Sequence, residues 1–286
     1  MTQHRAIQPG RAAVITGAGD GIGLAAARTL ADLGLNVVLA DRDEAKLGAA
    51  LRSVATAARD GAQTLGVACD VADFAQVQRL CERAFERFGD VAVLMNNAGV
   101  AGGGHAFENP DGWRRVMGVN LGGVINGVHA FTQRMIDEGR PAVIVNTGSK
   151  QGITAPPGDT AYNVSKAAIK TLTEGLAHTL RNTAHCQVSA HLLIPGFTFT
   201  GMTRRAGEKP PGAWTADQVA AFMLERLAAG DFYILCPDND VTREIDNARM
   251  TWAMQDITQN RPPLSRWHPD YEHAFAEFLV RETGGG

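Results

Sequence analysis

The sequence predicts an α/β fold built on a parallel β-sheet, and three observations indicate it. Segments with strand character alternate with segments of helical periodicity along most of the 286 residues. The second strand segment, residues 35–40, is almost continuously apolar, as is typical of a parallel strand buried on both faces. A glycine-rich turn at residues 17–23 joins the first strand to the first helix, where such folds place an anion-binding loop.

Composition and length fit one α/β domain of a cytoplasmic protein. Apolar residues make up 45% of the chain, enough for a large core. The net charge of −3 indicates neither nucleic acid nor an anionic membrane as a partner. The N-terminus lacks a signal-peptide pattern, and no apolar run is long enough to cross a bilayer. Four cysteines without zinc spacing are expected to be reduced thiols, and no metal site is predicted: Cys69, Cys81, Cys186 and Cys236.

The first strand, residues 12–16, stops at the glycine-rich turn, and a helix is expected to begin at once. Glycines let the backbone approach an anion, and the free N–H groups of the first helical turn point at it, so the turn suits a pyrophosphate. The spacing Gly17-x-x-x-Gly21-x-Gly23 departs from G-x-G-x-x-G, because Ile22 stands where the last glycine would be. An ordinary glycine-rich turn is the alternative.

A carboxylate directly follows the second strand, residues 35–40. Asp41 stands 20 residues after Gly21, where an acidic side chain can accept hydrogen bonds from the hydroxyls of an adenosine ribose. The alternative role is to cap the helix that runs to about Arg59, for which Asp43 is the better candidate. Both roles can coexist.

The third and fourth strands, residues 64–68 and 91–95, are also followed by polar residues. Asp70 is able to bind an adenine amino group or to cap the helix of residues 73–88, and the sequence favours neither role. The fourth strand ends in Asn96-Asn97-Ala98-Gly99, at the edge where an open parallel sheet forms its ligand crevice. A polar turn would have a similar composition.

The rest of the chain continues the alternation. Residues 113–138 are expected to form one long helix that contains Asn120, and its internal glycines indicate a bend or close backbone packing. Ser149 follows the fifth strand, Tyr162 and Lys166 lie in the next helix, and Pro195 follows the sixth strand. The expected strands are residues 141–146, 187–194 and 232–235, and the expected helices are residues 159–181 and 216–229.

Over roughly residues 10–200, these features resemble the classical short-chain dehydrogenase/reductase family in order and spacing. The residues that carry the resemblance are Thr16-Gly17-x-x-x-Gly21-Ile22-Gly23, Asp70-Val71, Asn96-Asn97-Ala98-Gly99, Asn120, Ser149, Tyr162-x-x-x-Lys166 and Pro195-Gly196. The resemblance implies one Rossmann domain with helices on both faces of a doubly wound, seven-stranded parallel sheet of order 3-2-1-4-5-6-7. It also implies a nicotinamide cofactor.

The site residues are carried over position by position. The resemblance implies a catalytic set of Asn120, Ser149, Tyr162 and Lys166. The residues expected to contact the cofactor, NAD, are Gly17, Gly19, Asp20, Gly21, Ile22, Asp41, Arg42, Asp70, Val71, Asn97, Ala98, Gly99, Tyr162, Lys166, Pro195, Gly196, Thr198 and Thr200.

The catalytic residue types support that chemistry independently. Tyr162 and Lys166 are four residues apart and so share a helix face. A free phenol has a pKa of about 10 and is a poor base at neutral pH, but an ammonium group nearby favours the phenolate. Such a base can remove an alcohol proton as hydride leaves, while Ser149 fixes the substrate oxygen. The resemblance further implies that Lys166 holds the nicotinamide ribose and that Asn120 supports Lys166 through a water molecule.

Beyond residue 240 the sequence departs from the classical family pattern. We expect a Rossmann-fold catalytic domain at residues 1–240, and at 241–286 a helical extension packed on the same domain or on a neighbouring subunit. The loops 102–104 and 207–212 are expected linkers, and the second resembles the family's mobile substrate-binding segment. The extension carries two apolar helical faces, formed by Val241, Ile245, Ala248 and Trp252, and by Tyr271, Ala274, Phe275, Phe278 and Leu279.

The sequence therefore predicts an alcohol dehydrogenase or ketone reductase that moves hydride between NAD(H) and a secondary alcohol or ketone, working as a dimer or tetramer in the cytoplasm. Asp41 and Asp20 would repel the 2′-phosphate of NADP, whereas Arg42 would attract it. The alternatives are an NADP(H)-dependent ketone reductase and a non-catalytic dinucleotide-binding regulator. The intact catalytic set argues against a regulator.

Overall fold

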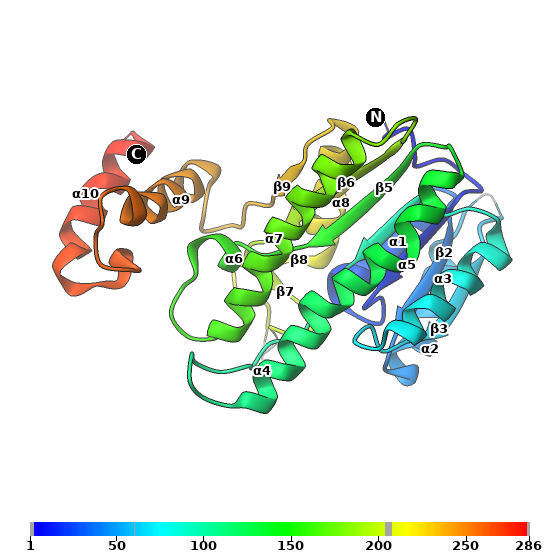
Figure 1. Ribbon diagram of the computed structural model, residues 1–286, viewed down its shortest axis with the longest axis horizontal. Coiled ribbons are helices and arrows are strands. Elements are labelled where there is room, and N and C mark those ends of the chain that lie inside the picture. The colour runs from blue at the N-terminus through cyan, green and yellow to red at the C-terminus, as the bar shows by residue number, and fades with distance from the viewer. Residues whose placement is uncertain (1–2, 60, 204–207, 285–286) are drawn as a thin grey trace.

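The computed structural model describes residues 3–59, 61–203 and 208–284, and at its centre lies a seven-stranded sheet in which every pairing is parallel. The strand order β3-β2-β1-β4-β5-β6-β9 is the order that the resemblance implied (Figure 1). The predicted fold class is therefore confirmed. The strands are β1 Ala12–Thr16, β2 Asn36–Asp41, β3 Thr64–Ala68, β4 Val93–Asn96, β5 Ala142–Thr147, β6 Val188–Ile194 and β9 Tyr233–Leu235.

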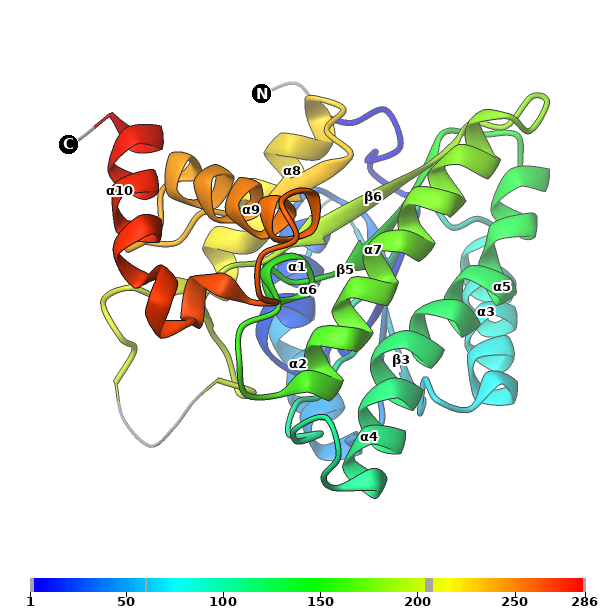
Figure 2. The same ribbon diagram turned by 60° about the vertical axis from the view of Figure 1, so that its left-hand side comes forward.

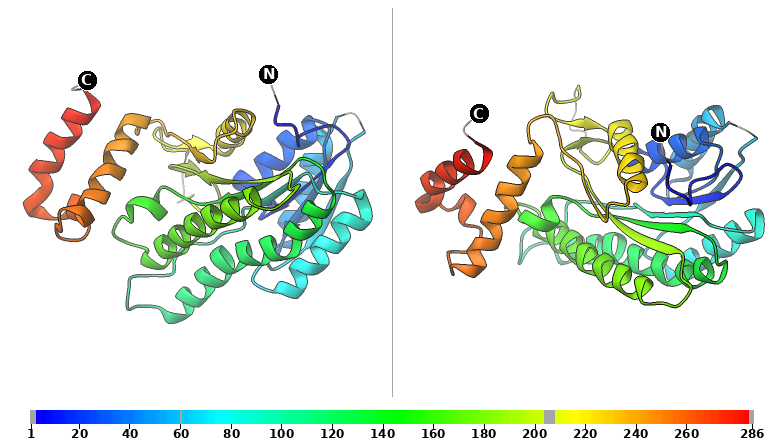
Figure 3. Two further views of the ribbon diagram at one scale, coloured as in Figure 1. Left: turned by 45° about the horizontal axis from the view of Figure 1, so that its top comes forward. Right: turned by 90° about the horizontal axis from the view of Figure 1, so that it is seen from above.

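Helices cover both faces of this sheet (Figure 3). Successive strand residues point to opposite faces, so Ala13 and Ile15 of β1 join one buried cluster and Val14 joins the other. Apolar surface on both faces explains why apolar residues predominate in these strands. One face is covered by α1 Gly21–Asp32, α2 Glu44–Ala57 and α8 Ala216–Ala228, and the other by α3 Phe74–Phe88, α5 Gly123–Asp137 and α7 Thr160–Arg181.

The long helix predicted at 113–138 is continuous but irregular. It consists of α4 Pro110–Val116, a π-helical turn at Met117–Gly122, and α5. The π-helical turn widens the helix where it carries Asn120, which is fully buried. A Cβ on Gly127 would overlap Oδ1 of Asn96, so this glycine lets α5 lie directly against β4. The predicted close backbone packing is confirmed.

Short elements at the edge of the domain were not predicted. They are α6 Gln151–Thr154 and a separate parallel pair, β7 Thr198–Phe199 with β8 Trp214–Thr215. Segments this short display no periodicity in a sequence. The β7–β8 pair brings the segment after β6 next to the start of α8.

The C-terminal extension forms α9 Arg243–Thr258 and α10 Glu272–Thr283, separated by two 3₁₀ turns, Ser265–Trp267 and Pro269–Tyr271. It lies at one end of the molecule, away from the sheet (Figures 1 and 3). The two predicted apolar faces pack mainly against each other: Trp252 meets the rings of Phe275 and Phe278 at centroid distances of 5.3 and 5.1 Å. Ala274, expected on the second face, is exposed instead.

Within the described parts of the chain, no helix combines the length and the apolar character that crossing a membrane requires.

Candidate active site

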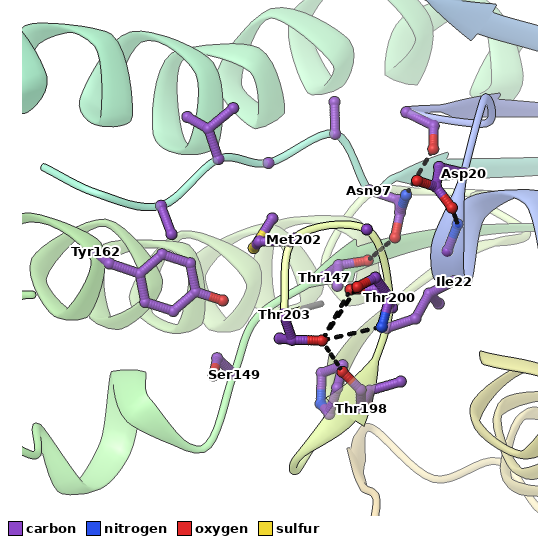
Figure 4. A pocket seen from close by; sticks show the side chains of 18 of the residues that line it. Asp20, Ile22, Asn97, Thr147, Ser149, Tyr162, Thr198, Thr200, Met202 and Thr203 are labelled. Atoms are coloured by element: carbon purple, nitrogen blue, oxygen red, sulfur yellow. Dashed lines mark hydrogen bonds between the residues drawn. The ribbon is translucent and has the colours of Figure 1, made fainter. Parts of the chain in front are cut away.

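A cavity of about 1010 Å³ opens at the carboxyl ends of the parallel strands. Its lining comes from the turn after β1, the end of β2, the loops that follow β4, β5 and β6, and the start of α7 (Figure 4). Open parallel sheets bind their ligands at this edge, and the volume is sufficient for a dinucleotide together with a small substrate.

Most of the predicted site residues line this cavity. Gly19, Asp70, Val71 and Asn120 do not belong to its lining. The predicted residues that do are Gly17, Asp20, Gly21, Ile22, Asp41, Arg42, Asn97, Ala98, Gly99, Ser149, Tyr162, Lys166, Pro195, Gly196, Thr198 and Thr200.

The glycine-rich turn requires glycine for steric reasons. Gly17 has φ +64°, and a Cβ there would lie 2.7 Å from Cα of Ala98. A Cβ on Gly23 would overlap the carbonyl oxygen of Gly17. The departure from the common dinucleotide spacing therefore reflects a differently packed turn that still leaves the N-terminus of α1 at the cavity.

Asp41 faces the cavity and stabilises the glycine-rich turn after β1 with a hydrogen bond. Its Oδ2 accepts the N–H of Gly19 at 2.9 Å, and its Oδ1 accepts the N–H of Asp43 at 3.0 Å. Asp43 caps α2 by accepting the N–H of Lys46, as predicted. The Lys46 ammonium, which the sequence reading did not single out, also lines the cavity and lies 3.4 Å from Asp20.

Asp70 has a local role in the turn after β3. Its Oδ1 accepts the N–H of Ala72 at 3.0 Å, while Asp73 is the residue that caps α3. The adjacent Val71 is buried, and its Cβ would lie 3.0 Å from a Cβ placed on Gly123. A contact between Asp70 and adenine stays a prediction.

Asn97 ties the loop after β4 to the glycine-rich turn. Its Nδ2 donates to the carbonyl oxygens of Thr16 and Gly17, at 3.0 and 3.3 Å. The hydroxyl of Thr147 donates to Asn97 Oδ1 at 3.5 Å. These contacts join three strand ends around the cavity.

Tyr162 points into the cavity from α7, on the same side as Ser149 (Figure 4). Asp159 caps α7 and accepts the Tyr162 N–H at 3.2 Å, and it also accepts the N–H of Gly102 at 2.6 Å. The loop after β4 is thereby fixed to the start of the helix that carries the phenol.

The electrostatics of Tyr162 differ from our expectation. Burial is the largest influence and raises the pKa of Tyr162, its hydrogen bond with Ser149 lowers it, and Asp159 raises it. The Lys166 ammonium lies 5.6 Å from the centre of the ring. The net shift of the Tyr162 pKa is therefore upward and not downward as expected, because desolvation outweighs the hydrogen bond with Ser149.

Lys166 is buried, and its Nζ donates to the carbonyl oxygen of Thr147 at 2.7 Å. Burial lowers the pKa of this ammonium to about 8. A lysine whose pKa lies close to physiological pH can gain or lose a proton at low cost.

Asn120 holds two neighbouring segments together from the π-helical turn. Its Oδ1 accepts the Val100 N–H at 2.8 Å, and its Nδ2 donates to the Val100 carbonyl and to Ser165 Oγ, both at 3.0 Å. Its Oδ1 and Lys166 Nζ both border Gly99, since a Cβ there would lie 3.4 and 3.7 Å from them. The direct contacts are with Val100 and Ser165, and a link to Lys166 through water stays a prediction.

Several residues of the lining were not predicted from the sequence. Lys150 and Gln151 directly follow Ser149, so adjacency was the available signal. Thr203 accepts the Thr200 N–H at 2.9 Å and closes the loop after β6. Gly207, part of the expected substrate segment, lies outside the described residues. Further residues of the lining that were not predicted are Val100, Ala101, Arg115, Phe197 and Met202.

Among the residues that the structure describes, no group of three or more His, Cys, Asp or Glu side chains is arranged to hold a metal ion.

Comparison with known proteins finds relatives along most of the chain. Residues 11–211 match the short chain dehydrogenase family. The 1-deoxy-11-beta-hydroxypentalenate dehydrogenase of Streptomyces exfoliatus is 34% identical over 265 residues, which cover 90% of this chain and 94% of that protein.

Solved structures share the fold. A short chain dehydrogenase/reductase from Burkholderia phymatum in complex with NAD is 38% identical, with a TM-score of 0.79 and coverage of 89% of this chain and 96% of that one. A metagenomic short-chain oxidoreductase in complex with NADP is 30% identical, with a TM-score of 0.66 and coverage of 81% and 98%.

Proposed function

The chain belongs to the short-chain dehydrogenase/reductase family, and on that premise we propose that it moves hydride between NAD(H) and a secondary alcohol or ketone, with Tyr162 as the general acid and base. One observation carries the proposal: the phenol of Tyr162 enters the cavity on the same side as Ser149 and has the Lys166 ammonium on its own helix, 5.6 Å from the centre of its ring. This arrangement suits removal of a proton from an alcohol.

Each residue has a separate task in this proposal. Tyr162 accepts the alcohol proton in oxidation and returns it in reduction. Ser149 hydrogen-bonds the substrate oxygen and so fixes its distance from the phenol. Lys166, anchored on Thr147, stabilises the phenolate by its charge and holds the nicotinamide ribose. Asn120 acts from outside the lining, by fixing Val100 and the α7 residue Ser165.

The residues at the cavity fit a dinucleotide. Gly17 and Gly23 leave no room for side chains, the N-terminus of α1 faces the cavity, and Asp41 stands at the end of β2. When bound, the nicotinamide supplies the hydride donor or acceptor of the reaction. The protein supplies orientation and the acid-base group.

We propose NAD as the preferred cofactor, because the carboxylates of Asp20, Asp41 and Asp43 all line the adenosine side of the cavity. NADP is the second candidate, and the cations Arg42 and Lys46 in the same lining favour it. Lys46 already lies 3.4 Å from Asp20, however, which reduces the positive charge that it offers to a phosphate.

For the substrate, we propose a secondary alcohol or ketone with a bulky, largely apolar body. Val100, Phe197 and Met202 contribute apolar surface to the cavity, and both Phe197 and Met202 are partly exposed. The name of the Streptomyces exfoliatus relative, a hydroxypentalenate dehydrogenase, is consistent with an alcohol on a larger carbon skeleton.

We further propose that residues 1–240 form the catalytic domain, residues 241–286 form a helical extension, and the protein works as a homo-oligomer in the cytoplasm. The apolar side chains of Met254, Ile257 and Val280 are exposed on the extension, which is a surface that a second subunit would cover. The free thiols of the four cysteines agree with a reducing compartment.

A screen of secondary alcohols, including bulky and aromatic ones, tests the proposal by following NADH absorbance. Turnover that Tyr162→Phe abolishes supports an enzyme that uses this phenol. If the protein binds NADH but the screen finds no turnover, the non-catalytic regulator becomes the better interpretation.

A further inference from the structure

A buried ion cluster connects the C-terminal extension to the edge of the cavity. Lys150, the residue after Ser149, places its Nζ 3.2 Å from Oδ2 of Asp238 and 2.6 Å from Oδ2 of Asp246. Both carboxylate side chains are only 6% exposed. Asp238 follows β9 and Asp246 lies in α9, which packs beside α6 (Figure 2). One ammonium group therefore joins the segment after β5 to the loop after β9 and to α9, which lie 88 and 96 positions further along the chain.

The same cluster supports the segment after β6. Asp238 Oδ2 accepts the Phe197 N–H at 3.3 Å. A Cβ on Gly196 would lie 2.6 Å from that carboxylate oxygen and 3.0 Å from Lys150 Nζ, so the ion pair packs directly against the glycine backbone. The Lys150 N–H also donates to the carbonyl oxygen of Pro195 at 3.2 Å.

The cluster thus contacts two neighbouring segments that line the cavity. Ser149 is covalently adjacent to Lys150, while Gly196 and Phe197 line the cavity from the segment after the adjacent strand β6. Lys150 itself also belongs to the lining. A contact that merely anchored α9 to the domain would not need to lie against the backbone of these residues.

The charges make the cluster sensitive to the loss of any member. Taking away one partner of a buried ion pair leaves an uncompensated charge, which destabilises the local arrangement strongly. Four charged side chains line a small second cavity beside the cluster: Lys150, Asp246, Arg249 and Arg266. Asp238 does not line this cavity but forms an ion pair with Lys150.

We propose that Lys150 is a positioning residue, which uses the carboxylates of Asp238 and Asp246 to hold Ser149 and Gly196 at the cavity, so that α9 takes part in shaping the active site of its own subunit. The effects expected on turnover rest on the proposed dehydrogenase function, whereas the effects expected on local structure do not. Displacing a catalytic group by about 1 Å can lower a rate by about a hundredfold, so Lys150 can control turnover without touching the substrate.

Four variants test this proposal by steady-state kinetics. Lys150→Met and Asp246→Asn are each expected to lower kcat by about tenfold or more, because Ser149 and Gly196 lose their support. Binding of ADP-ribose, which lacks the nicotinamide, should stay unchanged. Lys150→Arg should keep most of the activity, because arginine retains the positive charge. The double variant should be no worse than Lys150→Met, because that substitution already removes the ion pair with Asp246.

Lys170→Met is the matched control. Lys170 pairs with Glu174 at 2.7 Å on α7, and neither residue belongs to the cavity lining. Its removal should leave kcat and the melting temperature nearly unchanged, as is usual for an exposed pair.

Hydrogen exchange provides a readout that needs no turnover. In Lys150→Met and Asp246→Asn, the amides of residues 148–154 and 196–199 should exchange faster, while those of α1 and α2 keep their protection. Asp246→Asn preserves the size of the side chain, so it tests the proposal even if Lys150→Met fails to fold. Unchanged kcat and unchanged exchange at these segments would overturn the inference. Faster exchange in a protein without any turnover would instead leave the cluster supported and contradict the proposed function.

Discussion

Lys166 donates a hydrogen bond from its Nζ to the carbonyl oxygen of Thr147 at 2.7 Å. Thr147 is the last residue of β5, and Ser149 follows two positions later. The contact therefore ties the helix that carries Tyr162 to the strand end that carries Ser149. The separation of the two hydroxyl groups at the cavity therefore depends on this buried lysine.

Tyr162→Phe is expected to lower turnover by about a hundredfold to ten-thousandfold, the usual range for loss of a general acid or base. Only the oxygen that transfers the proton is removed, so NADH should bind with unchanged affinity. Kinetics and NADH fluorescence titration measure the two quantities. Tyr233→Phe is the control, because that phenol is bonded to Glu174 away from the cavity. Near-normal turnover of Tyr162→Phe would eliminate the proposed mechanism.

Alcohol oxidation should accelerate as the pH rises, and ketone reduction should slow down. Oxidation requires the phenolate of Tyr162, whereas reduction requires the phenol. Because burial raises the pKa of Tyr162, its deprotonated fraction should still be growing in the alkaline range. Below the Lys166 pKa of about 8, the charged ammonium favours the phenolate; above it, this help is lost and the rise becomes shallower.

The measurement for this prediction is kcat/KM in both directions between about pH 6 and pH 11, which brackets the ordinary pKa of a phenol. A profile that is flat in both directions would show that no titrating base limits the reaction. Tyr233→Phe should keep the shape of the unmodified profile.

NAD is expected to be preferred over NADP by about a hundredfold in kcat/KM. We expect the 2′-phosphate of NADP to lie beside Asp41, and two unit charges about 4 Å apart repel by roughly 4 kcal/mol at an effective dielectric near 20. If screening by solvent and salt reduces this repulsion to about 2.7 kcal/mol, kcat/KM is about a hundredfold higher with NAD than with NADP. Asp41→Ser should reduce the preference for NAD over NADP, mainly by lowering the KM for NADP.

Asp43→Asn is the matched control for that experiment. Asparagine caps a helix about as well as aspartate does, so α2 keeps its N-cap while one neighbouring negative charge is lost. The cofactor ratio should change much less than in Asp41→Ser. Equal efficiency of the unmodified protein with both cofactors would mean that the carboxylate of Asp41 serves only to brace Gly19 and Asp43.

Gly127→Ala should destabilise the protein by about 1–3 kcal/mol or more, because the new methyl group would overlap Asn96 between α5 and β4. Gly175→Ala is the control: it lies inside α7, and a Cβ there meets nothing within 4 Å. Alanine at this position should stabilise the helix by about 0.5–1 kcal/mol. Thermal or denaturant unfolding measures both changes, and equal effects of the two substitutions would contradict the packing described for α5.

A chain truncated after Asp240 should lose assembly, solubility or substrate affinity. The truncation removes the cluster of Ala248, Trp252 and Phe278 and takes Asp246 away from Lys150. Sedimentation and steady-state kinetics report on assembly and affinity. If the shortened protein stays soluble with unchanged assembly and kinetics, the extension is only an appendage, and the role proposed for α9 fails with it.

Much of this protein follows from local patterns in its sequence. The strands are buried on both faces and are therefore rich in apolar residues, so the parallel sheet was predictable. Glycines that admit no side chain mark the turn after β1, and the spacing between Tyr162 and Lys166 places both on one helix face. Each of these signals depends on a few neighbouring residues, which is the range over which a sequence can be read directly.

Other features depend on which segments meet in space. The sign of the pKa shift of Tyr162 is set by burial among residues from several loops, and no local pattern reports that burial. The partners of Asn120 are Val100 and Ser165, 20 and 45 residues away. In the same way, Lys150 meets carboxylates 88 and 96 positions further along the chain. Local sequence determined the helices, the strands and the types of the reactive residues. Tertiary packing decided the surroundings of the reactive residues, and hence their charges and alignment. The reason is that desolvation and ion pairing depend on distance in space and not on separation along the chain.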